Sequence, residues 1–236
     1  MNLLKLRSVA FVSILLTAAG VSAATLPAPV DAAITDVETR RTAAGEELRF
    51  TFKMHTVTAE SEFQFRFDPQ SSDGWTLVSE ETKQTAKMRE RMIKRAIEQE
   101  HGPDRELLVS DLRELIGDKI ELVENDDRQR VYRFDLSEEA AIGGDGGSFD
   151  ASKHLTGELA IGPGDRLLWL RFFAPKAFKP AVVAKIKSFN LKMFYDPIWP
   201  DGPYVLVRQS MNLDGSAFFK SFKEDVETQY TEFEKR

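Results

Sequence analysis

The chain has 236 residues, no cysteine and a formal net charge of −6 at pH 7. Such an acidic chain is a poor candidate for binding nucleic acids or anionic membranes, because both recruit Lys and Arg side chains to neutralise phosphates. The absence of cysteine excludes disulfides, thiol catalysis and the lipid-modified cysteine of a bacterial lipoprotein.

The first residues have the pattern of a secretory signal peptide. Lys5 and Arg7 precede an apolar run over 9–21, which is followed by small residues. That run is shorter than the about 20 residues of a membrane-spanning helix, so we expect a cleavable signal peptide over 1–23. Residues 24–236 are long enough to bury the core of a single domain. We expect this domain in the periplasm, without stable insertion into a membrane.

The part of the chain that follows predicts a β-hairpin after a flexible leader. Residues 25–33 are rich in Ala and Pro and predict a flexible entry. Apolar and polar residues then alternate over 47–57 and 62–68, a period of two that is typical of paired strands, and a short strand is expected over 75–78. Because alternate side chains of a strand point to one face, we expect five rings on the interior face: Phe50, Phe52, Phe63, Phe65 and Phe67.

Helical spacing replaces the alternation after residue 81. Residues 82–99 predict an amphipathic helix whose narrow apolar stripe includes Met88 and Met92. Asp104 is expected to cap a second helix, which Gly117 ends. Methionine adapts to irregular apolar partners, so the thin stripe predicts that the first helix gates access to the interior.

The C-terminal half predicts consecutive strands joined by turns. Strands without alternating helices favour an antiparallel sheet, and a Gly-rich loop is expected over 143–147. We expect an α+β fold, in which a strongly curved antiparallel β-sheet forms an incomplete β-barrel and two helices cover its open side. The expected strands cover 120–123, 130–136, 154–161, 166–173, 185–195, 204–211 and 217–234, with a turn over 212–215.

No motif in the chain predicts an enzyme. His55, His101 and His154 lack the spacing of metal ligands, and no nucleophile signature such as G-x-S-x-G is present. We therefore expect a non-enzymatic protein that uses no metal and no cofactor. The abundant carboxylates leave a hydrolase such as an esterase as a third alternative.

Aromatic residues are abundant, with 17 Phe, 3 Trp and 4 Tyr. They suit a packed sheet core, and they equally suit an apolar cavity between sheet and helices that receives an acyl chain. The order of elements over most of 24–236 resembles the periplasmic lipoprotein-sorting carrier superfamily, the LolA/LolB-like fold. The resemblance is carried by the segments LTGELAIGPGDRLLWLRFFAP, KIKSFNLKMFYDPIWPDGPYVLVRQSMNLDG and QYTEFEKR.

This resemblance implies an incomplete antiparallel barrel with a hydrophobic interior, and it identifies no particular site residue. It implies binding or carriage of a hydrophobic envelope component, such as a lipid or a lipoprotein acyl chain. In that case the candidate ligand-binding residues are the five Phe named above together with Met88 and Met92. The alternative is a structural or adaptor domain that fills its interior with its own side chains and binds another envelope protein.

The exported protein is expected to begin at or within a few residues of Ala24, because the small residues before this position suit signal peptidase. The intact mass of protein released from the periplasm measures the start directly. Retention of residues 1–23 in that soluble fraction would contradict the expectation of a cleavable signal.

Overall fold

The computed structural model describes residues 26–45, 47–98, 102–109, 111–138, 140–144, 147–218 and 220–236. The expected signal peptide lies outside these residues. The strands are β1 (Phe50–Thr58), β2 (Glu62–Phe67), β3 (Trp75–Leu77), β4 (Ile116–Asn125), β5 (Arg130–Leu136), β6 (Ala141–Gly144), β7 (Gly147–Asp150), β8 (Thr156–Ile161), β9 (Leu167–Phe173), β10 (Phe178–Ala181), β11 (Ala184–Pro197), β12 (Tyr204–Ala217) and β13 (Lys220–Lys235). The helices are α1 (Ala28–Ala44), α2 (Lys83–Glu98), α3 (Pro103–Glu106) and α4 (Leu112–Leu115).

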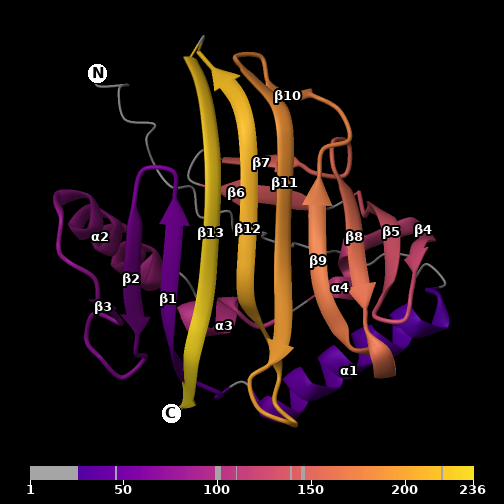
Figure 1. Cartoon of the computed structure of the whole chain (residues 1–236), viewed down its shortest axis with the longest axis horizontal. Coiled ribbons are helices and arrows are strands. Elements are labelled where there is room, and N and C mark those ends of the chain that lie inside the picture. The colour runs from indigo at the N-terminus through magenta and orange to yellow at the C-terminus, as the bar shows by residue number, and fades with distance from the viewer. Residues whose placement is uncertain are drawn as a thin grey trace.

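Most of the described chain forms one open antiparallel sheet of 11 strands. Its order is β3-β2-β1-β13-β12-β11-β9-β8-β5-β4, with β10 paired to one end of β11, while β6 and β7 form a separate pair. Figure 1 shows the sheet in front, with α2, α3, α4 and the β6–β7 pair behind it. The expectation of a large antiparallel sheet accompanied by a few helices is confirmed.

The two edges of the sheet are consecutive strands of the chain. β1 pairs with β13, so the first and last strands meet inside the sheet, and β3 and β4 are left at the edges. The chain between these edge strands carries α2, α3 and α4. The helices therefore lie, in sequence, where a closed sheet would join β3 to β4.

The N-terminal hairpin forms as its alternation predicted. β1 and β2 pair with Phe52 opposite Phe67 and Met54 opposite Phe65. Both strands therefore turn the same set of apolar side chains to one face. The expected helix over 82–99 is also present as α2, although residue 99 lies outside the described chain.

The flexible leader expected over 25–33 is wrong, because α1 begins at Ala28. Pro29 occupies the first turn, where a helix has no acceptor for the missing backbone N–H. Apolar side chains at helical spacing then bury one side of the helix. These residues are Val30, Ala33, Ile34 and Val37. Packing of this stripe outweighs the local signal of the prolines.

The single helix expected from Asp104 to Gly117 is also wrong, because two four-residue helices, α3 and α4, take its place. The intervening chain bonds to β12: the Leu206 N–H donates to the Leu107 carbonyl at 2.8 Å, and the Val109 N–H donates to the Tyr204 carbonyl at 3.2 Å. These backbone bonds replace helical ones. Asp104 lies inside α3 and makes no capping bond.

Gly117 and Gly215, which were expected to end a helix and to form a turn, lie inside strands, where close packing leaves no room for a side chain. Gly117 belongs to β4, where an added Cβ would lie 2.9 Å from the Asp135 carbonyl. Gly215 lies inside β12, and an added Cβ would meet the Phe222 ring at 2.7 Å. The turn expected over 212–215 is therefore wrong: β12 continues to Ala217 before the chain reverses.

The remaining strands agree with the expected meander in order and extend it in detail. β4 and β11 are longer than expected, and β10 was not predicted. The loop expected over 143–147 contributes to the β6–β7 pair on its described residues, with Gly144 opposite Gly147. Three backbone hydrogen-bonded strand pairs, β5–β8, β8–β9 and β9–β11, complete this half of the sheet.

A buried ion pair fixes α3 against the start of β1. The Asp104 side chain is fully buried, and its Oδ2 accepts bonds from Arg49 Nε at 2.8 Å and from the Phe50 N–H at 3.2 Å. The Arg49 side chain is 42% exposed. Loss of Arg49 is therefore expected to cost more stability than loss of Asp104, because only the Asp104 carboxylate is cut off from water.

We predict that Arg49→Met lowers the free energy of unfolding by about 3–5 kcal/mol, because it leaves a buried carboxylate unpaired. Asp104→Ala should cost about 1–3 kcal/mol, mainly for the unsatisfied Phe50 N–H, since Arg49 can turn to solvent. The double variant should resemble Asp104→Ala. Urea denaturation measures all three, and equal, additive losses would contradict this account.

Candidate functional site

The five phenylalanines expected on one face are buried together, with exposed fractions between 0% and 2%. Phe52 lies at the centre of an aromatic group: its ring centroid is 5.3 Å from that of Phe67, 5.5 Å from that of Trp75 and 5.8 Å from that of Tyr230. Such offset and edge contacts add to the free energy of apolar burial. The predicted shared interior face is thus confirmed. We call this part of the core the aromatic end.

The helix α2 packs on the aromatic end through its methionines. Met88 and Met92 are buried and belong to the same apolar core as the Phe rings. Arg89 adds polar contacts, donating from Nε to the Trp75 carbonyl at 3.0 Å and from Nη2 to Asp73 at 2.7 Å. Within the described residues, no backbone hydrogen bond joins α2 to the sheet. On the described residues, side chains make the contacts that join this helix to the sheet.

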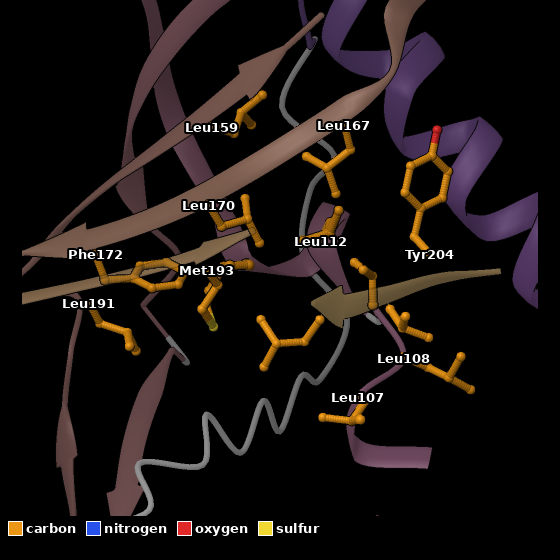
Figure 2. Close-up of a cluster of buried hydrophobic side chains, with 14 of the residues drawn as sticks. Leu107, Leu108, Leu112, Leu159, Leu167, Leu170, Phe172, Leu191, Met193 and Tyr204 are labelled. Carbon is orange, nitrogen blue, oxygen red and sulfur yellow. The ribbon is translucent and has the colours of Figure 1, made fainter. Parts of the chain in front are cut away.

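The other part of the core is rich in leucine, and we call it the leucine end. Figure 2 shows Leu107, Leu108 and Leu112, from the chain between and within α3 and α4, among side chains from the sheet. All belong to the same continuous core as the aromatic end. The labelled sheet residues are Leu159, Leu167, Leu170, Phe172, Leu191, Met193 and Tyr204.

The candidate residues chosen from sequence cover only the aromatic end. The leucine end was not predicted as a site, because the sequence analysis gave the ranges of its strands and did not assign their side chains to a face. Alternation within β9 and β11 signals it: Leu170 and Leu191 are buried next to the partly exposed Arg171 and Lys192. The residues that cover the leucine end from the other side belong to the segment around α3 and α4. Hydrogen bonds to β12 determine the conformation of that segment.

A polar group on α1 fixes that helix to the start of β12. The Tyr204 hydroxyl donates to Asp36 Oδ2 at 3.0 Å, and Arg40 Nε donates to Asp36 Oδ1 at 2.9 Å. Burial raises the pKa of Tyr204, and the Asp36 carboxylate raises it further. The hydroxyl is therefore a neutral donor over the physiological range, and α1 serves as a fixed support of the leucine end.

The opposite face of the sheet carries a charged cluster. Glu158 is 7% exposed at its side chain, and its two oxygens accept bonds from Arg133 at 2.9 Å and from Arg171 at 3.1 Å. Lys192 lies over the Trp169 ring, with 3.8 Å from Nζ to the ring centroid. Because its chain neighbours are buried in the core, the Lys192 side chain points away from the helices.

Cations outnumber carboxylates in this outer cluster. Burial lowers the pKa of Lys192, and the nearby Arg171 guanidinium lowers it further. The Arg208 guanidinium lies 4.0 Å from the Phe194 ring centroid. Among the described residues, neither Lys192 nor Arg208 forms an ion pair. Arginines stacked on aromatic rings are common at protein interfaces, so this face is a second candidate surface.

Neither a metal-binding cluster nor a membrane-spanning helix is found in the described chain. No group of three or more His, Cys, Asp or Glu side chains there has an arrangement that holds a metal ion. No helix there is long and apolar enough to cross a membrane. Comparison of the chain with protein-family models, with curated proteins and with solved structures gave no match. The candidate site is thus defined by its own geometry alone.

We predict that Phe52→Ala lowers the free energy of unfolding by about 3–5 kcal/mol, because it leaves a cavity at the centre of the aromatic end. Phe218→Ala provides a matched control, since Phe218 is 60% exposed, and it should change stability by less than about 0.5 kcal/mol. Thermal and urea unfolding measure both. Equal effects of the two substitutions would contradict the central position of Phe52.

Proposed function

We propose that this protein is a non-enzymatic periplasmic carrier of a hydrophobic envelope component, a lipid or a lipoprotein acyl chain. The observation that carries the proposal is the continuous apolar layer between one face of an open sheet and the helices. Burial of an acyl chain in such a layer would be favourable by about 0.8 kcal/mol per methylene. No metal, cofactor or nucleophile is needed for this function.

The topology supports an incomplete barrel with a helical cover. The two edge strands of the open sheet, β3 and β4, follow one another among the strands of the chain and do not pair with each other. The chain between these strands carries three helices on the same side as the apolar core. In the proposal this opening is the route by which an acyl chain reaches the interior, and the helices cover it when the protein is empty.

The unequal attachment of the helices supports a moving part. α3 is held by the buried Asp104 carboxylate, and the chain after it bonds to β12 through backbone groups. α2 is held by Met88, Met92 and the contacts of Arg89. A helix without backbone bonds to its support opens at lower cost than one that has them. We therefore assign the gate to α2 and the fixed wall to α3 and α4.

The experiment isolates the exported protein from its own envelope and measures bound lipid by native mass spectrometry, before and after addition of the envelope lipid extract. Wild-type protein should carry lipid of diacyl or acyl-chain mass. Phe65→Glu, which places a charge in the aromatic end, should abolish binding and reduce stability. A folded wild-type protein that neither retains nor takes up lipid would refute the carrier proposal.

The gate is tested by the rate of uptake of a fluorescent long-chain fatty acid. Arg89→Ala removes the contacts to Asp73 and Trp75, and a loss of about 1 kcal/mol should accelerate uptake about five-fold. Lys87→Ala is the matched control, because Lys87 is exposed on the same helix. Equal uptake rates in the two variants, with lipid still bound, would remove the gating role from α2 and leave carriage intact.

The adaptor function remains the second candidate, and the outer cluster of cations on aromatic rings favours it. In that case the interior stays filled by its own side chains, and the surface around Arg171, Lys192 and Arg208 binds an acidic envelope protein. Lys192→Glu together with Arg208→Glu separates the candidates. The double variant should keep lipid binding if the protein is a carrier, and should lose a crosslinked envelope partner if it is an adaptor.

A further inference from the structure

Two turns at one end of the sheet expose apolar side chains side by side. The turn between β10 and β11 consists of Val182 and Val183, and the turn after β12 begins with Phe218. The Phe218 N–H donates to the Val183 carbonyl at 3.0 Å, and Figure 1 shows both turns at the top. Val182 is 98% exposed, Val183 49% and Phe218 60%. We call these three residues the apolar tip.

The composition of both turns is opposite to that of ordinary hairpin turns. Two-residue turns favour Asn, Asp and Gly, which adopt the required backbone and are well solvated. Val182 and Val183 are β-branched and apolar, and Phe218 has a φ of 48°, which is unusual for a bulky side chain. Val182 and Val183 do not have positive φ, so their turn accepts most residues and permits these apolar side chains without requiring them. Such local departures are expected where a surface has a function.

Lysines lie close to the apolar tip in the sequence. No acidic residue occurs between Pro175 and Ser188, and Asp214, the carboxylate nearest the second turn in sequence, pairs with Lys187 at 3.2 Å. Within the described residues, the other lysines of this end form no ion pair. Lys179, Lys185 and Lys220 lie within three residues of the tip in sequence, and Lys176 and Lys223 lie farther along the chain. This end is thus locally basic although the whole chain is acidic.

We propose that the apolar tip docks the protein on an anionic lipid surface. Val182, Val183 and Phe218 would enter the boundary between headgroups and acyl chains, and the surrounding lysines would bind the phosphates. Three side chains on two narrow turns are too small for a stable protein interface, which buries about 800 Å² per partner. Insertion into a lipid surface needs no matching shape.

The net negative charge of the chain disfavours binding to anionic membranes, but the charge near the tip is what a membrane meets there. A charged surface acts over a Debye length of about 8 Å at physiological salt, and a strand advances about 3.3 Å per residue. A membrane touching the tip therefore senses the lysines near it and little of the acidic residues elsewhere. The docking inference stands independently of what the interior holds.

The absence of cysteine makes a site-specific test direct. Val182→Cys and, as a control, Val78→Cys are labelled with an environment-sensitive fluorophore; Val78 is 47% exposed and follows β3. Vesicles of phosphatidylcholine with phosphatidylglycerol should shift the emission of the Val182 probe to the blue. The Val78 probe should not respond. Equal responses, or no response at Val182, would overturn the proposal.

Flotation of the unlabelled exported protein with the same vesicles supplies the second arm. Val182→Asn with Val183→Asn removes both apolar side chains at positions whose φ is not positive, so it should change the melting temperature little while losing most vesicle binding. Lys185→Gln with Lys220→Gln should weaken binding to phosphatidylglycerol vesicles and make it less dependent on salt. Undiminished binding of the Asn-Asn variant would overturn the role of the tip, whether or not the interior carries lipid.

Discussion

The pairing of β1 with β13 is the contact on which the rest of the structure depends. These strands are separated by most of the described chain, and they are joined by ladder hydrogen bonds, by the Thr56–Thr228 hydroxyl contact at 3.0 Å and by the Phe52–Tyr230 ring contact. Their meeting turns a meander into a sheet whose edges are β3 and β4. It thereby decides that the helical segment connects the two edge strands and that the aromatic end forms from the first three strands together with the last.

The same arrangement separates the molecule into parts with different roles. One face of the sheet and the helices enclose an apolar layer, in which Asp36 attaches α1, Asp104 and backbone bonds attach α3 and the chain after it, and Arg89 and two methionines attach α2. The other face carries Glu158 between two arginines, next to cations stacked on rings. The long hairpins end away from both, at the basic apolar tip. In the proposed carrier, storage, gating and docking thus use separate surfaces.

Local patterns predicted those features that a few neighbouring residues decide. Alternation placed Phe63, Phe65 and Phe67 on one face correctly, and helical spacing located α2. Errors arose where distant contacts outweighed local signals. Prolines before α1 suggested a leader, although the stripe from Val30 to Val37 packs as a helix. The leucine-bearing segment after Asp104 suggested one helix, although its backbone bonds to β12 instead.

The sequence by itself determined the antiparallel class of the sheet, the hairpin of aromatic residues and the amphipathic character of α2, because each follows from a period of two or of 3.6 residues. Only the tertiary structure decided which strands form the edges, that the leucine end joins the aromatic end in one core, and that Val183 and Phe218 meet at one tip. Periodicity assigns a face to a side chain within its own element. It contains no information on which distant element covers that face, since strand pairing between remote segments depends on the free energy of the whole assembled core.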